Sequence, residues 1–118
     1  MNITVYGIPN CQTVKKARDW LDAHQIKYTF HDFKKLGVSK ELILLWLKSV
    51  DLHQLINRSG MTFRNLTEPQ KLLSQNQDDA IALMIQNPSM IKRPVLVTPQ
   101  KIHLGFKDVD YASLFGQT

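Results

Sequence analysis

The first third of the chain changes its hydrophobic period twice. The run "NITVYGI" is β-branched and aromatic and closes at a glycine, which predicts a buried strand over Ile3–Tyr6. From Thr13 to about His24, apolar residues recur at helical spacing with charged residues on the opposite face. The segment "IKYTFHDF" then alternates apolar and polar residues, which indicates a second strand. A β-α-β unit of this length implies two parallel strands joined by a right-handed crossover.

The middle of the chain is predicted to be an all-helical insert over about residues 39–88. Ser39 is a good N-cap for "KELILLWLKSV", and the six apolar residues from 42 to 47 predict a helix enclosed by other elements. Shorter helices follow, with expected caps at Asp51 and Thr67, and the last of them stops before Pro88.

The last third predicts a hairpin followed by a helix. The short strand patterns "PVLVT" and "KIHLGF" are joined by a turn at Pro99-Gln100. Asp108 is the expected cap of the last helix, with Val109, Ala112 and Phe115 on one side. The order is β-α-β, helices, β-β-α, with no internal repeat or linker, so we expect one α/β domain over residues 1–118.

Composition limits the classes of function. The 118 residues are 43% hydrophobic and 21% charged, with no apolar run near the roughly 20 residues that cross a bilayer. The net charge of +5 would suit a nucleic-acid partner, but the basic residues are mostly scattered and do not interleave with aromatic ones. Because the N-terminus lacks signal-peptide features and one cysteine cannot form an internal disulfide, we expect a cytoplasmic protein.

Cys11, the only cysteine, lies where the first strand meets the first helix. In open α/β sheets, chemistry gathers at such junctions. The N–H groups of a helix start, with Lys15, Lys16 and Arg18 nearby, favour the thiolate, which is the nucleophilic form. A small buried, inert thiol is the alternative interpretation of a free cysteine.

Other residues could complete a site around this thiol. Asn10 and Thr13 flank it and could hydrogen-bond to it, or simply cap the helix. Arg93 directly precedes the third strand, which in this topology should start beside the first helix, so Arg93 could reach an anion held at Cys11. Pro94 is a candidate for a cis peptide bond. The four histidines show neither i, i+4 pairing nor cysteine companions, so no metal site is expected.

Three stretches, "YGIPNCQTVKKARDWL", "INRSGMTFRNL" and "IKRPVLVT", together resemble the arsenate reductase-like ArsC/Spx/YffB family of the thioredoxin superfamily, closest to its YffB-like branch. The resemblance covers essentially the whole chain. It implies a thioredoxin-like mixed sheet with an inserted helical bundle, a reactive Cys11 and a cis-Pro94, and it implies that Arg58 and Arg93 bind an anion. A third arginine of true arsenate reductases is missing, because its aligned position is Phe106.

The sequence and the resemblance predict a bacterial, cytoplasmic thiol oxidoreductase with Cys11 as its single catalytic thiol. A lone thiol needs an external thiol to resolve its mixed disulfide, and glutathione is the expected co-substrate, with no bound cofactor. The glutathione carboxylates would suit Arg58 and Arg93, with Lys15 as a further anion-binding residue. A small oxyanion, a glutathionylated protein and an organic disulfide all fit as the substrate.

Two alternatives stay open. One is arsenate reduction, against which the missing third arginine argues. The other is a non-enzymatic regulator similar to the Spx-type members of the family, which would bind RNA polymerase. This chain has Val14 where those regulators have a second cysteine, so a disulfide switch is impossible here. The sequence contains no motif for binding RNA polymerase.

Overall fold

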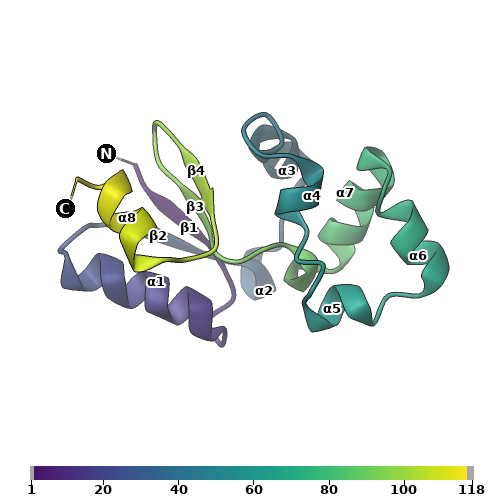
Figure 1. The fold of residues 1–118 in the computed structure, drawn as a ribbon, viewed down its shortest axis with the longest axis horizontal. Coiled ribbons are helices and arrows are strands. Elements are labelled where there is room, and N and C mark those ends of the chain that lie inside the picture. Colours follow the sequence, from purple (N-terminus) through teal and green to yellow (C-terminus); the bar gives the residue numbers. More distant parts are fainter. Residues whose placement is uncertain (1, 117–118) are drawn as a thin grey trace. The chain divides into compact units, whose positions relative to one another are not determined.

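The computed structural model describes residues 2–116 and divides the chain into two compact units (Figure 1). The first unit is built from the segment that ends at Asp32 and the segment that begins at Arg93. The second unit is the intervening stretch, Phe33–Lys92. The predicted helical insert, about residues 39–88, therefore lies inside the second unit, which extends beyond it at both ends.

A four-stranded mixed sheet forms the centre of the first unit, with the strand order β2-β1-β3-β4. β1 (Thr4–Gly7) runs parallel to β2 (Thr29–Asp32), which confirms the predicted parallel pair. β3 (Val95–Val97) runs antiparallel to β1, and β4 (Ile102–Leu104) runs antiparallel to β3. The hairpin predicted at the end of the chain is therefore also confirmed.

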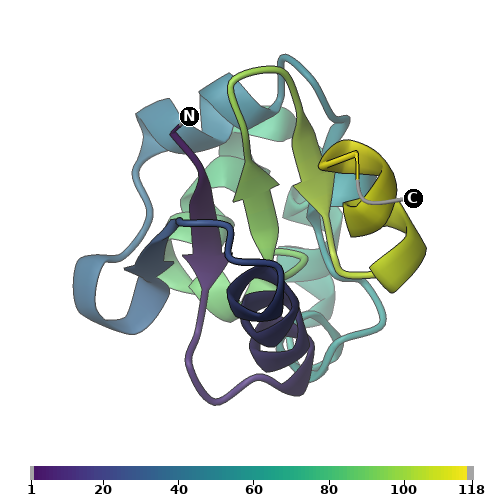
Figure 2. The same ribbon diagram turned by 90° about the vertical axis from the view of Figure 1, so that its left-hand side faces the viewer.

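Two helices of the first unit, α1 (Gln12–Ala23) and α8 (Asp108–Leu114), lie on the same face of this sheet (Figure 2). Side chains of β1 alternate between the two faces of the sheet. Val5 is fully buried on the face that carries these helices, while its neighbours Thr4 and Tyr6 point to the other face and are half-buried. Val5 pairs with Leu96 across the sheet, and both pack with α1 residues and Tyr111 in one hydrophobic core. This core fixes α1, and with it the helix start next to Cys11.

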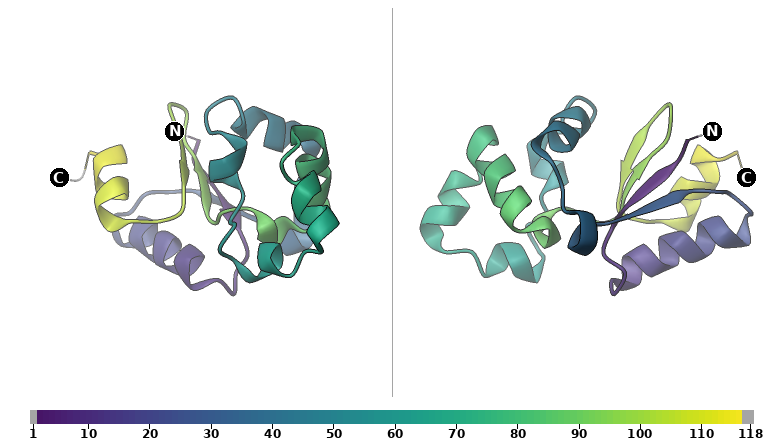
Figure 3. Two further views of the ribbon diagram at one scale, coloured as in Figure 1. Left: turned by 45° about the vertical axis from the view of Figure 1, so that its right-hand side comes forward. Right: turned by 180° about the vertical axis from the view of Figure 1, so that it is seen from behind.

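The second unit consists of short helices (Figure 3). α7 packs against α3 and α6 within this unit. Over residues 2–116, none of the helices has the length and apolar content required to span a membrane. The helices of the second unit are α2 (Phe33–Leu36), α3 (Lys40–Trp46), α4 (Leu52–Leu55), α5 (Met61–Arg64), α6 (Glu68–Leu73), α7 (Gln77–Gln86) and the 3₁₀ helix η1 (Pro88–Met90).

The prediction that α3 is too apolar for a surface helix and is enclosed by other elements is wrong. Ile43 and Trp46 are fully buried, but the side chains of Leu44 and Leu45 are 37% and 49% exposed. The apolar run is wide enough for a central helix, yet only the stripe containing Ile43 and Trp46 packs inward.

The prediction that Asp108 caps the last helix is also wrong. Lys107 is the N-cap of α8, and Asp108 is its first helical residue. The Asp108 carboxylate instead accepts a hydrogen bond of 3.2 Å from the indole Nε1 of Trp20. The buried residue of α8 is Tyr111. Of the three residues predicted to share one side of this helix, Ala112 and Phe115 are partly buried against the core, while Val109 is 73% exposed.

Candidate active site

Cys11 occupies the N-cap position of α1, with an extended backbone at φ −111° and ψ 126°. β1 ends at Gly7, four residues earlier, so the thiol lies just beyond the carboxyl end of a central strand of the sheet. The side chain is half-buried and unbridged. This is the junction at which the sequence predicts a reactive thiol.

The surroundings of Cys11 lower the pKa of its thiol. Partial burial is the largest single influence and by itself raises the pKa. It is outweighed by the backbone N–H groups of Val14 and Thr13 and by the guanidinium of Arg93, which all favour the charged sulfur. These N–H groups are directed at the sulfur, but the Cys11 side chain makes no capping hydrogen bond with them. The oxygen of a hydroxyl or carboxylate cap would satisfy such N–H groups more fully.

Arg93 reaches the thiol because of the sheet topology. β3 begins one residue after Pro94, and its first residue, Val95, pairs with Tyr6 near the carboxyl end of β1. The chain therefore enters the sheet beside the strand that leads to Cys11. The side chain of Arg93 donates a hydrogen bond to the Cys11 sulfur and adds a Coulombic interaction with it. The Arg93-Pro94 peptide bond is cis, as predicted.

Two of the three cations of α1 named above, Lys15 and Arg18, are engaged elsewhere. Lys15 forms an exposed ion pair of 2.6 Å with Asp19, one turn along the helix. The Arg18 guanidinium lies 4.0 Å from the centroid of the Phe30 ring, and its Nε donates a 3.2 Å hydrogen bond to the Tyr28 hydroxyl. The groups that lower the thiol pKa are backbone amides and Arg93 rather than these side chains.

The two polar neighbours of Cys11 differ in what they contribute. Asn10 lies in an exposed turn before the helix. Thr13 is the second residue of α1, and its backbone N–H favours the thiolate. Val14, whose N–H does the same, was not among the residues that the sequence singled out as a site. Its position three residues after the N-cap is a usable signal, because the N–H at that place is a usual donor to a capping atom.

Arg58, the other predicted anion-binding arginine, belongs to the second unit. It precedes α5, and its guanidinium lies 5.4 Å from the centroid of the Phe63 ring. Its Nε atom is buried and has no hydrogen-bond partner among the described residues. A guanidinium with an unsatisfied buried N–H is a candidate for binding an anion.

Phe106, at the position where the resemblance implies a third arginine, is part of the aromatic packing of the first unit. Its ring lies edge-on to Tyr111 with 4.7 Å between the centroids. It is partly buried against the same core that holds α1 and the sheet together. The role of this residue in the structure is therefore packing.

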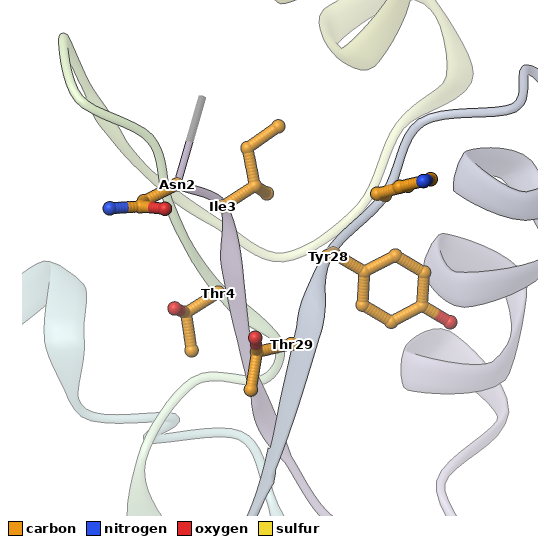
Figure 4. Close-up of a pocket in the computed structure, with 6 residues that line it drawn as sticks. Asn2, Ile3, Thr4, Tyr28 and Thr29 are labelled. Atoms are coloured by element: carbon orange, nitrogen blue, oxygen red, sulfur yellow. The ribbon is translucent and has the colours of Figure 1, made fainter.

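A separate hollow of about 380 Å³ lies at the amino ends of β1 and β2 (Figure 4). Its lining includes the paired residues Thr4 and Thr29 together with Asn2 and Tyr28. Cys11 follows the opposite end of β1, so this hollow is not part of the thiol site.

Comparisons with known proteins agree on one family. The family model described as "ArsC family" matches residues 6–114. A solved structure named YFFB (PA3664) protein is 44% identical, covers 94% of this chain and 96% of its own, and superimposes with a TM-score of 0.89. An arsenate reductase (ArsC) related protein from Brucella melitensis is 48% identical over 98% of this chain and 95% of its own, with a TM-score of 0.74.

A more distant relative carries a different kind of name. The global transcriptional regulator Spx of Streptococcus agalactiae is 26% identical over 108 residues, which are 90% of this chain and 77% of the regulator. The structural matches confirm the predicted thioredoxin-like fold. The relatives are thus named both as reductase-related proteins and as a regulator.

Proposed function

The chain belongs to the ArsC family, and we propose that within it this protein is a thiol oxidoreductase that uses one cysteine and is reduced by glutathione. The observation that carries the proposal is the combination of a thiol with a lowered pKa and an arginine that donates to its sulfur. Cys11 is the only cysteine of the chain, so a second thiol must come from another molecule.

The proposed reaction has two thiol-disulfide exchanges. In the first, the Cys11 thiolate attacks the glutathione sulfur of a mixed disulfide R–S–S–G, forms Cys11–S–S–G and releases the R–S⁻ thiolate. In the second, the thiolate of a free glutathione attacks the glutathione sulfur of this adduct, which yields oxidised glutathione and restores the Cys11 thiolate. One disulfide is broken and one is formed in each step, so the substrate is reduced and two glutathione units leave as a disulfide.

Arg93 has two roles in this scheme. Its guanidinium stabilises the Cys11 thiolate before attack and again when that thiolate is the leaving group. Arg93 and Arg58 are proposed to bind the carboxylates of glutathione, since a guanidinium presents paired donors to a planar anion. Arginine-to-alanine changes at the two positions, followed by calorimetric titration with glutathione, test this assignment, and unchanged affinity in both variants would contradict it.

Arsenate is expected to be a poor substrate. An arsenate ester on Cys11 would carry several anionic oxygens, whereas the carboxylates of glutathione lie away from the reacting sulfur. Phe106 supplies aromatic packing where the resemblance implies a third arginine, which leaves less preorganised positive charge for such an ester. Arsenate reduction coupled to glutathione should therefore be slow or undetectable, and brisk turnover would show that the substrate class is wrong.

The central experiment is intact mass spectrometry after incubation with oxidised glutathione. We expect a one-to-one glutathione adduct that is absent from Cys11→Ser and that reduced glutathione removes. In a separate turnover assay, the wild-type protein should reduce a glutathionylated peptide at the expense of reduced glutathione. Absence of the adduct from the wild-type protein would contradict the proposal.

A pull-down without reductant distinguishes this enzyme from a docking regulator. Partners linked through a disulfide are retained by the wild-type protein and lost from Cys11→Ala. A partner that persists equally in Cys11→Ala is held by docking, and would favour the regulator.

A further inference from the structure

Gly7, the last residue of β1, lies against the side chain of Val14 in the first turn of α1. A Cβ atom placed on Gly7 would be 2.8 Å from Cγ2 of Val14 and 3.3 Å from its Cγ1. Carbon atoms in proteins do not approach to 2.8 Å without a shift of one of them, since favourable contacts lie at about 3.5–4.0 Å. The first turn of α1 can therefore come this close to the sheet only because position 7 has no side chain.

Backbone conformation does not explain this glycine. Over residues 2–116 the glycines with positive φ are Gly37, Gly105 and Gly116, and Gly7 is not among them. Its backbone continues the β1 ladder and pairs with Asp32. Alanine would be compatible with that conformation, so the contact with Val14 is the feature that requires glycine.

Val14 cannot turn away from an added methyl group. Its side chain is fully buried, and a β-branched residue in a helix has one strongly preferred χ1 rotamer. A clash at Cγ2 would consequently move the backbone of the first turn of α1. That backbone includes the Val14 N–H, which is one of the groups directed at the Cys11 sulfur.

We propose that Gly7 is a positioning residue for the thiol: by admitting Val14 against the end of β1, it sets the distance between the first turn of α1 and the Cys11 sulfur. The inference rests on the proposed function only in that the thiol must be a reactive one. Gly7 does not touch the reacting atoms, and it acts through Val14.

Alkylation of Cys11 by iodoacetamide as a function of pH tests the inference in the full-length protein. Gly7→Ala should shift the midpoint toward that of free cysteine and slow alkylation at pH 6 by about three- to tenfold, the size expected when a hydrogen bond to a charged group is weakened. An unchanged pH profile in Gly7→Ala would overturn the inference.

The double variant Gly7→Ala with Val14→Ala identifies the route. Removing Cγ1 and Cγ2 leaves the Val14 Cβ at 3.7 Å, an ordinary contact distance, and keeps the N–H of residue 14. We expect the double variant to recover the wild-type profile and to match Val14→Ala measured beside it, because the methyl group added at position 7 then meets no branched side chain. A double variant that stays slow would show that the effect does not pass through Val14 and would overturn the inference.

A stability control uses Ile3→Val, which removes one methylene from the hydrophobic core of the first unit at the residue just before β1 and leaves the contact between Gly7 and Val14 intact. It should lower the denaturant midpoint and leave the pH profile unchanged, and a profile shifted as in Gly7→Ala would overturn the inference. Should Gly7→Ala not fold, the double variant decides: a folded protein with the wild-type profile supports the inference, and any other result overturns it.

The glutathione adduct separates this inference from the proposed function. If Gly7→Ala slows alkylation as expected but the wild-type protein forms no glutathione adduct, only the oxidoreductase proposal is contradicted. A wild-type alkylation midpoint equal to that of free cysteine overturns both.

Discussion

Four helices of the second unit begin differently from α1 of the first unit. α3, α4, α6 and α7 each start with a side-chain oxygen that accepts a hydrogen bond from a backbone N–H three residues on; the caps are Ser39, Asp51, Thr67 and Asn76, at 3.1, 2.8, 3.2 and 3.2 Å. α1 starts with Cys11, whose sulfur makes no such capping bond. In one region the first N–H groups of a helix are satisfied by structure, and in the other they face a thiol that can carry a negative charge. At α1 the absence of a side-chain cap coincides with a thiol of lowered pKa, and this combination indicates function rather than local stability.

The largest expected effect comes from turning α1 into a helix of the ordinary kind. Cys11→Ser supplies a good N-cap oxygen, so the variant should lose adduct formation completely while gaining up to about 1 kcal/mol in free energy of unfolding. Urea unfolding and intact mass together check this. A Cys11→Ser protein that is less stable than the wild type at pH 6 would contradict this, because the sulfur would then be a better N-cap of α1 than a hydroxyl.

The next largest effect is expected from Arg93. Arg93→Ala removes a hydrogen bond and a positive charge from the thiolate, and should slow alkylation at pH 6 by about tenfold or more, in line with hydrogen bonds to charged groups. Lys15→Ala and Arg18→Ala are matched controls, because each also removes one cation, and both should change the rate by less than about twofold. Equal effects in all three variants would mean that net charge, rather than Arg93 itself, tunes the thiol.

A cap in the second unit should affect stability alone. Asp51 and Gln54 form a capping box in which each side chain accepts from the other residue's backbone N–H. Asp51→Ala should cost about 0.5–2 kcal/mol of unfolding free energy and leave the alkylation profile of Cys11 unchanged. A shifted profile would show that the thiol depends on the capping of α4.

The smallest expected effect is a pH dependence of stability. Because the folded state lowers the thiol pKa, ionisation of Cys11 stabilises the fold at high pH, and this contribution is lost as the pH falls through the folded pKa. The stability advantage of Cys11→Ser should therefore shrink as the pH rises from below the folded pKa to about 8.5, the value for free cysteine. An advantage that stays constant or grows over that range would contradict a lowered pKa.

The sequence predicted best what depends on neighbouring residues. The caps Ser39, Asp51 and Thr67 follow from a short local pattern, and all are confirmed. The nearness of Arg93 to Cys11 followed from strand order, since topology brings the start of β3 to the end of β1. Family resemblance added the thioredoxin-like fold, which the solved structures confirm.

What the sequence missed depends on contacts between distant segments. Asp108 looked like a cap because its local pattern fits, but its carboxylate is engaged by the indole of Trp20, far away in the sequence. Leu44 and Leu45 are exposed because packing inside the second unit covers only one stripe of α3. The close contact between Gly7 of β1 and Val14 of α1 depends on how tightly the strand and the helix pack, which no pattern of residues in the sequence predicts.

The first unit is assembled from the two ends of the chain, with the whole second unit inserted between them. A protein leaves the ribosome amino end first, so β1, Cys11 and α1 emerge long before Arg93 and β3. Until the last strands arrive, the nascent chain has neither the β1–β3 pairing nor the guanidinium that favours the thiolate. The thiol therefore gains its arginine partner only after the whole second unit has been synthesised.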